Sequence, residues 1–337
     1  MIVEGTVLRG PEFEPIEGRV VVEDGEITAI EEEAVHTENI VLPAFVNAHT
    51  HLGDSIAKEA GAGLSLDDLV APPDGLKHRL LAEATPEETI EAMHRSLRLM
   101  GSTGTAACIE FREGGVAGVE AIREAAADLP IEPTILGRES EAAMRASDGF
   151  GASGARDADF DRLRNVTREA GKLFGIHAGE RDPHDINAAL DLDPDFLVHM
   201  VHPEAIHYDR VADNGTPVVV CPRSNLVTGV GVPPIRELGE RTTVALGTDN
   251  VMLNSPSMFR EMAAAAKLAD VPATEVLRMA TRNGAELAGL NYGVVEPGRE
   301  AKLLVLDGDT DNLTGAQDVV RAVVRRAGAA DVKDVIL

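Results

Sequence analysis

Apolar segments alternate with stretches of helical periodicity from residue 40 onward. Eight of these segments have strand character: 40–49, 105–111, 131–137, 148–153, 172–177, 196–201, 217–221 and 243–248. Residues 87–100, 118–127 and 160–170 between them predict helices. Eight strand–helix units in about 250 residues predict an α/β fold, a (β/α)8 TIM-type barrel. A doubly wound sheet is the alternative, but the glycine-rich phosphate fingerprint expected after its first strand is missing.

The two ends of the chain have a different pattern, of short β-branched segments separated by turns. Strand character appears at 2–8, 19–23 and 26–30, where Asp24-Gly25 is a strong hairpin signal, and again at 298–306, 319–324 and 332–337. Forty residues are too few for a stable sheet of their own. We therefore expect the first and last forty residues to pair with each other.

Charge and composition limit the classes of partner. The chain has 31 Lys and Arg against 57 Asp and Glu, a formal charge of −26, so we expect neither nucleic acid nor a membrane surface as a partner. Scarce lysine and an absence of tryptophan are typical of halophilic proteins. With no long apolar run, no basic leader and only two cysteines, the sequence predicts a cytoplasmic protein.

Histidines and one aspartate stand at the ends of several predicted strands. His49 and His51 lie two residues apart, so both side chains would face the same side of a strand. His177 and His199 end two later strands, and Asp249 follows the eighth. Barrel active sites lie at the carboxyl ends of the strands. Three imidazoles and a carboxylate, with a position left for water, predict a hydrolytic metal site.

The segments that carry these residues resemble the amidohydrolase superfamily, in its cytosine-deaminase-like and chlorohydrolase-like branch. The resemblance rests on LPAFVNAHTH (42–51), IHAGE (176–180), VHMVH (198–202), CPRSN (221–225), LGTD (246–249), and two later segments, MATRNGA (279–285) and EPGREA (296–301). It implies a small β-sandwich from residues 1–43 and 294–337 around a metal-binding barrel at 44–293.

The resemblance also implies roles for individual residues. The ligands of one divalent ion would be His49, His51, His177 and Asp249, with Glu180 as proton shuttle and His199 as a second catalytic residue. Nitrogen and oxygen ligands do not choose among zinc, iron, manganese and nickel, although zinc is the expectation.

These roles predict hydrolysis of a non-peptide carbon–nitrogen bond. Metal-bound hydroxide, activated by Asp249, would attack an sp² carbon, while Glu180 transfers protons and His199 stabilises the intermediate. The expected substrate is a small molecule, a purine- or pterin-like heterocycle or nucleoside that loses ammonia. Cyclic amide hydrolysis and chlorohydrolase-type removal of another group are the alternatives. A non-catalytic scaffold is disfavoured because no ligand is missing, and a homodimer is common among similar proteins.

Other residues near the predicted mouth bear on the substrate. Arg112 and Arg138 end the second and third strands, and Asn225 follows the seventh, so all three are candidate substrate-binding residues. The arginines suggest an anionic or carbonyl-rich substrate, and ion pairs at the rim are the alternative. Residues 61–79, with Pro72-Pro73-Asp74-Gly75, form a candidate lid.

Overall fold

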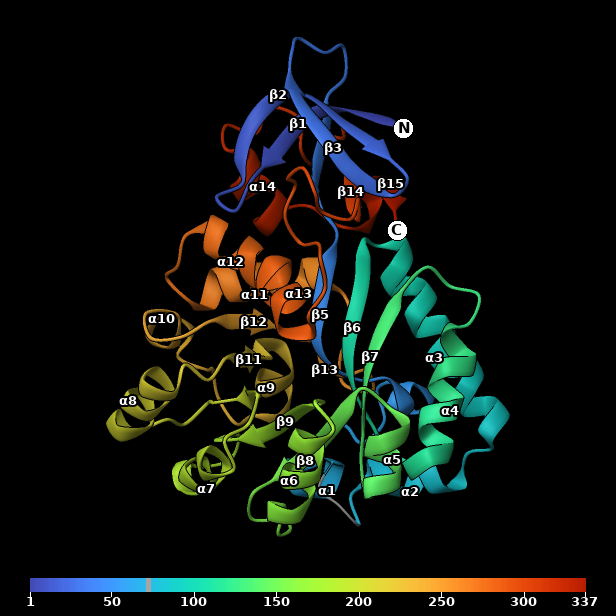
Figure 1. Cartoon of the computed structure of the whole chain (residues 1–337), viewed down its shortest axis with the longest axis vertical. Coiled ribbons are helices and arrows are strands. Elements are labelled where there is room, and N and C mark those ends of the chain that lie inside the picture. Colours follow the sequence, from blue (N-terminus) through green and yellow to red (C-terminus); the bar gives the residue numbers. More distant parts are fainter. Residues whose placement is uncertain (71–73) are drawn as a thin grey trace.

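The computed structural model describes residues 1–70 and 74–337. Figure 1 shows two parts, a small sheet that contains strands from both chain ends and, below it, a larger sheet with helices around it. Within the described ranges, no helix is both long enough and apolar enough to cross a bilayer.

The larger sheet has nine strands in the described residues, in the order β12-β11-β10-β9-β8-β7-β6-β5-β13, and all neighbours run parallel. Its strands are β5 (Phe45–His51), β6 (Thr105–Arg112), β7 (Glu132–Gly137), β8 (Gly149–Gly154), β9 (Leu173–Ala178), β10 (Phe196–His199), β11 (Val218–Val220), β12 (Val244–Leu246) and β13 (Asp249–Asn250). β12 and β13 end that order on opposite sides, yet only residues 247–248 separate them in the chain. The sheet is therefore curled.

The approach of β12 and β13 to β5 depends on small side chains and polar contacts. The Thr248 amide donates to His49 O at 3.1 Å, and Asn47 Nδ2 donates to Thr248 Oγ1 at 2.7 Å. A Cβ atom on Gly247 would lie only 2.7 Å from His49 Cβ, which explains a glycine at this position. These contacts of residues 247–248 with β5, the seam at Gly247, bring residues about two hundred positions apart in the sequence into direct contact.

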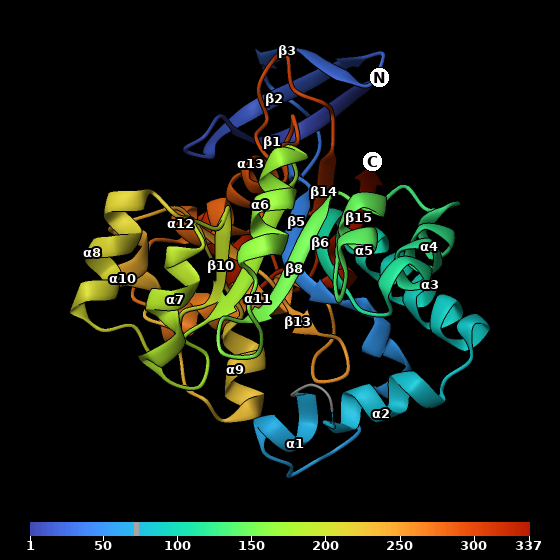
Figure 2. The same ribbon diagram turned by 60° about the horizontal axis from the view of Figure 1, so that its bottom comes forward.

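Helices surround the larger sheet and connect its strands (Figure 2). They are α1 (Leu66–Val70), α2 (Leu76–Glu83), α3 (Pro86–Ser102), α4 (Gly115–Ala126), α5 (Glu141–Ala146), α6 (Asp161–Glu169), α7 (Ile186–Asp191), α8 (Ala205–Asn214), α9 (Pro222–Thr228), α10 (Ile235–Gly239), α11 (Met258–Leu268), α12 (Ala273–Ala280) and α13 (Arg282–Ala288), with 3-10 turns η1 (Leu52–Ala57) and η2 (Pro183–Asp185). A third 3-10 turn, η3 (Ala329–Asp331), lies in the carboxyl-terminal segment, just before the last strand of the smaller sheet. The start of α3 is fixed by a capping box between Thr85 and Glu88.

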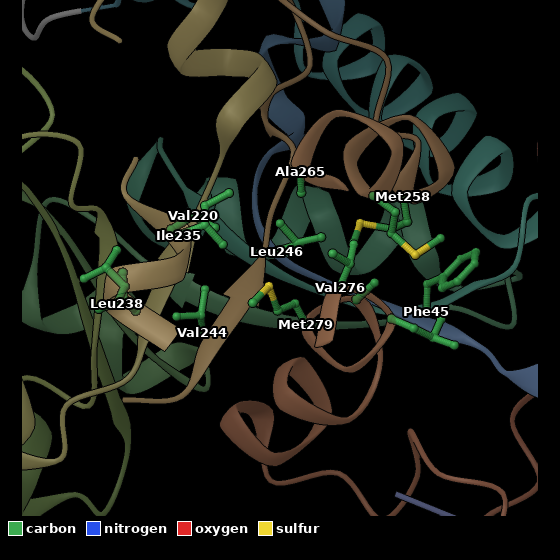
Figure 3. Packing of buried hydrophobic residues seen from close by; sticks show 14 of the residues in the cluster. Phe45, Val220, Ile235, Leu238, Val244, Leu246, Met258, Ala265, Val276 and Met279 are labelled. Carbon is green, nitrogen blue, oxygen red and sulfur yellow. The ribbon is translucent and has the colours of Figure 1, made fainter. Parts of the chain in front are cut away.

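Buried apolar side chains fill the space between the larger sheet and its helices. Figure 3 shows part of this core, with residues of β5, β11 and β12 and of helices α10 to α12: Phe45, Val220, Ile235, Leu238, Val244, Leu246, Met258, Ala265, Val276 and Met279. The rings of Phe45 and Phe259 meet edge to face, with centroids 5.0 Å apart. This core therefore holds the helices against the larger sheet.

The smaller sheet contains strands from both chain ends, as expected from the sequence. Its order is β15-β14-β4-β1-β2-β3, and its strands are β1 (Ile2–Arg9), β2 (Glu14–Glu23), β3 (Glu26–Glu32), β4 (Asn39–Pro43), β14 (Leu303–Asp307) and β15 (Val332–Ile336). Neighbours are antiparallel except β1 and β4. The described strands form one mixed sheet here, so the two-layer sandwich is not confirmed. The predicted domain boundaries at residues 44 and 294 stay a prediction.

One element predicted as a strand is a helix. Residues 319–324 belong to α14 (Val319–Arg325), because Asp318 caps the helix by accepting from the Arg321 amide. Val320, Val323 and Val324 then share one buried face against α11 and α12. The β-branched composition suggested a strand, whereas the cap and the spacing of three and four residues decide for the helix.

Two other predicted segments differ in detail. The strand predicted at 40–49 is divided at Ala44 into β4 and β5, because β4 pairs in the smaller sheet and β5 in the larger one. The candidate lid at 61–79 contains α1 and the start of α2, while its Pro72 and Pro73 lie outside the described residues.

Candidate metal centre

Polar side chains from separate strands meet at the carboxyl ends of the larger sheet. The predicted ligands occupy the end of β5, the end of β9 and the start of β13: His49, His51, His177 and Asp249. The end of β5 lies away from the smaller sheet, on the side of α1 and α2 (Figure 1). The structure thus brings together residues that are up to two hundred positions apart in sequence.

The distances among these side chains fit a shared ligand. His49 Nε2 lies 3.3 Å and His51 Nε2 lies 3.7 Å from Asp249 Oδ1, and His51 Nε2 lies 3.5 Å from His177 Nε2. Ligand atoms of His49, His51 and Asp249 are within 4.8 Å of one another, as are those of His49, His177 and His199. A divalent cation bound to nitrogen and oxygen would satisfy such a cluster.

The hydrogen bonds of the histidines support the same interpretation. His49 is fully buried, and neither of its ring nitrogens has a hydrogen-bond partner among the described residues. A buried polar group without a partner costs stability unless an ion or water satisfies it. His177 Nδ1 lies 2.8 Å from Ala152 O and donates to it, which leaves Nε2 unprotonated and directed at the cluster. The chemistry of these side chains therefore fits a metal ion.

Burial keeps these imidazoles neutral in the metal-free protein. Burial lowers the pKa of His51 to about 3, with a further contribution from the Lys77 ammonium. The pKa of His177 is well below its ordinary value because of burial and the neighbouring His49 ring. Neutral imidazole is the form that binds a metal.

Asp249 is held as a carboxylate by polar neighbours. Its Oδ2 accepts from Ser224 Oγ at 2.6 Å, and its Oδ1 accepts from Asn250 Nδ2 at 2.9 Å. Burial favours the neutral acid, but the interaction with the adjacent His49 side chain holds the pKa of Asp249 well below its usual value. Its backbone φ of +59° is left-handed, a strained conformation typical of functional sites.

The predicted catalytic pair lies beside the cluster. Glu180 Oε2 is 3.7 Å from His199 Nε2, and both residues have ligand atoms within 4.8 Å of Asp249. Burial raises the pKa of Glu180. The side-chain amide of Asn225 lies 3.1 Å from His199 Nδ1, so Asn225 contacts the ring nitrogen of His199 that does not face Glu180. His199 also has a left-handed φ, of +80°.

A cavity of about 270 Å³ opens onto the cluster. Five of the predicted metal-binding and catalytic residues line it: His51, His177, Glu180, His199 and Asp249. Leu66 and Val70 of α1 and His78 of α2 also line it, so part of the candidate lid faces the cavity. Its size suits a small molecule with one or two rings.

The arginines at the mouth already have partners. Arg138 lines the cavity and donates to Glu113 at 3.1 Å. Arg112 does not line it: the side chain is buried, and Nε donates to Gly118 O at 3.2 Å. Arg181 lines the cavity and pairs with Asp67. These contacts favour the ion-pair interpretation over a free anion-binding rim.

Two residues of the site were not predicted from the sequence. Glu113 follows β6 directly, and its Oε1 lies 2.9 Å from His51 Nδ1. Lys77 of α2 is buried, and its Nζ lies 2.8 Å from the same oxygen. The position of Glu113 at a strand end was a usable signal, whereas nothing in the sequence around Lys77 indicated its burial at the site.

Comparison with known proteins agrees with the geometry. Residues 40–337 match the model of the amidohydrolase family. A protein of Methanothermobacter thermautotrophicus named "Putative aminohydrolase" is 39% identical over 352 residues, which cover 91% of each chain. The 5-methylthioadenosine/S-adenosylhomocysteine deaminase of Halobacterium salinarum is 27% identical over 99% of this chain and 90% of its own length.

Solved structures show the same fold. An adenosine deaminase of Xanthomonas campestris with bound zinc superposes with a TM-score of 0.82 at 21% identity, covering 100% of this chain and 91% of that one. The chain therefore belongs to the amidohydrolase family and is an enzyme, a hydrolase of carbon–nitrogen bonds, as the sequence predicted.

Proposed function

We propose that the chain deaminates a purine- or pterin-like heterocycle or a nucleoside by hydrolysis. The observation that carries the proposal is the buried cluster of His49, His51 and Asp249, which adjoins Glu180 and His199 at the wall of one cavity. The deaminase name of the relative from Halobacterium salinarum supports the choice of an amino leaving group. The curled parallel sheet with consecutive edge strands supports a (β/α)8 barrel as the scaffold.

His49, His51, His177 and Asp249 would hold one divalent ion. The bound zinc of the deaminase from Xanthomonas campestris favours zinc. When bound, such an ion lowers the pKa of a water molecule toward about 7 and so supplies a nucleophile at neutral pH.

Two carboxyl groups, those of Asp249 and Glu180, transfer the protons. Asp249, a carboxylate that already accepts from Ser224 and Asn250, takes a proton from the attacking water. Glu180, whose pKa burial raises, carries a proton to the ring nitrogen or to the leaving amine. His199, fixed by the Asn225 amide, orients the substrate through Nε2.

The test is an ammonia-release screen over purines, pterins and nucleosides, with metal content measured on the same samples. Glu180→Gln should abolish turnover and retain the metal, whereas His177→Ala should lose the metal as well. Glu204→Gln, at an exposed position where α8 begins, is the control and should behave as wild type. Full activity of the Glu180→Gln and His177→Ala variants would refute the assignment, and turnover without ammonia would point to cyclic amide hydrolysis.

The strongly acidic composition supports a second, independent proposal, that the protein works at high salt. High salt screens repulsion among the acidic residues behind a formal charge of −26. The midpoint of thermal unfolding should therefore rise from dilute buffer to molar KCl, and equal midpoints would contradict a halophilic origin.

A further inference from the structure

Lys77 is a buried cation that comes from outside the curled sheet. It lies on α2, and Figure 2 shows α1 and α2 at the end of the molecule opposite the smaller sheet. Its side chain is 3% exposed. Leu76 and Leu80 of α2 also pack against a cluster that contains Met252, and His78 Nε2 lies 3.2 Å from Val70 O of α1.

The ammonium group of Lys77 contacts two residues that each hold a predicted metal ligand. Its Nζ lies 2.8 Å from Glu113 Oε1, and this oxygen lies 2.9 Å from His51 Nδ1. The same Nζ donates to Asn250 Oδ1 at 3.0 Å, and Asn250 Nδ2 donates to Asp249 Oδ1 at 2.9 Å. One side chain of α2 thus reaches His51 and Asp249 through one intermediate residue each.

We propose that Lys77 is a positioning residue that links the packing of α2 to the geometry of the metal centre. The inference rests on the proposed metal centre. The Glu113 carboxylate contacts the ring of His51 at Nδ1, on the side away from the cluster that Nε2 faces, and Lys77 forms an ion pair with the same carboxylate oxygen. Partners one step behind the metal ligands set ligand orientation, and their loss commonly weakens metal binding about 10- to 100-fold.

A direct role of Lys77 in binding substrate is the competing interpretation, since Lys77 also lines the cavity. An ammonium group has three donors. Two of these donors face Glu113 and Asn250. The carboxylate of Asp54 is a third neighbour, with its Oδ2 3.9 Å from Nζ. Little donor capacity therefore remains for a substrate.

The experiment measures zinc affinity by competition with a chelator for wild type, Lys77→Met, Glu113→Gln and the double variant. Lys77→Met should weaken zinc binding about 10- to 100-fold. The double variant should lose less affinity than the product of the two single losses, because Lys77 acts on His51 through Glu113 and only its contact with Asn250 adds to the loss in Glu113→Gln. Lys58→Met, an exposed position at the end of η1, is the matched control and should keep wild-type affinity.

Three outcomes separate the possibilities. Wild-type zinc affinity in Lys77→Met together with a raised KM would overturn the proposal and make Lys77 a substrate-binding residue. If Lys77→Met does not fold, Lys77→Gln is measured instead, and wild-type zinc affinity in that variant would equally overturn it. A wild-type protein that binds no divalent metal would refute the proposed function itself, which distinguishes the two failures.

Discussion

The two sides of the candidate metal centre are held by different chemistry. The Nδ1 atoms of His177 and His199 have neutral partners, the Ala152 carbonyl and the Asn225 amide. His51, on the other side, faces the carboxylate of Glu113, which also contacts Lys77 and Arg138. The neutral partners come from β8 and α9, close to the strands that carry the ligands, whereas one of the charged partners comes from α2.

This difference predicts where the site is robust and where it is sensitive. A neutral hydrogen bond contributes about 1 kcal/mol, and its loss can be met by small local shifts. Buried charged groups stabilise the folded state only when each is paired with a group of opposite charge. Removal of one partner leaves an unpaired buried charge and lowers the free energy of unfolding by about 3–5 kcal/mol. The Glu113 side should therefore dominate stability, and the His199 side should affect turnover.

The largest effect is expected from Glu113→Ala. The change leaves the buried Lys77 and the partly buried Arg138 without their shared carboxylate, and should lower the free energy of unfolding by about 3–5 kcal/mol. Urea denaturation of the metal-free protein measures this loss. Glu91→Ala, which removes an exposed ion pair with Arg95, is the control and should cost less than about 1 kcal/mol. Equal losses in the two variants would contradict the comparison.

The pH dependence of the metal-free protein gives the next largest effect. His51 has a pKa of about 3 in the folded state and about 6.5 when unfolded, so the unfolded chain binds more protons as pH falls below 6.5. Stability is therefore lost as pH falls, by about 2 kcal/mol from this residue between pH 7 and pH 5.

The measurement compares urea midpoints at pH 7 and pH 5 for wild type and His51→Asn. The variant should lose about 2 kcal/mol less than wild type over this interval. His36→Asn changes an exposed histidine and should leave the pH dependence as it is. A His51→Asn variant with the full wild-type loss would show that His51 is not kept neutral by burial.

On the neutral side, Asn225→Ala should reduce kcat while the metal stays bound. Without the amide, His199 Nδ1 is buried and has no hydrogen-bond partner, which costs about 1–3 kcal/mol. If this cost appears in the activation free energy, kcat falls by up to about a hundredfold. Steady-state kinetics with parallel metal analysis tests this expectation. Loss of the metal in this variant would mean that His199 belongs to the ligand set.

The smallest effect is expected from Arg181→Gln. Its partner Asp67 is exposed, and exposed ion pairs contribute about 0–1 kcal/mol. The free energy of unfolding and the KM for a neutral substrate should therefore stay near wild type. A large rise in KM confined to anionic substrates would revive the interpretation of the mouth as an anion-binding rim.

Much of the site was predictable because it depends on local geometry. His49 and His51 share a strand face by the two-residue period, and His177 and Asp249 stand at strand ends that a parallel sheet must bring to one edge. The pairing of the chain ends was also predictable, because neither end can form a stable sheet alone.

The remaining features depend on contacts that no local pattern encodes. Lys77 enters the site because α2 packs across η1, and periodicity does not specify where a short helix lies. The division of residues 40–49 at Ala44 reflects a change of partner strand, which a continuous apolar segment conceals. In the same way, the valines of α14 adopt a helix because Asp318 caps it and because their buried face packs against α11 and α12.

The seam at Gly247 has a consequence for biosynthesis. His49 emerges from the ribosome early, but Asp249 follows only after another two hundred residues, so a nascent chain cannot assemble the cluster until most of its length has been made. The edge contact between β5 and β13 closes a very long loop, a slow event in folding. A cation that binds residues on both edges would stabilise only chains in which β13 has already paired with β5.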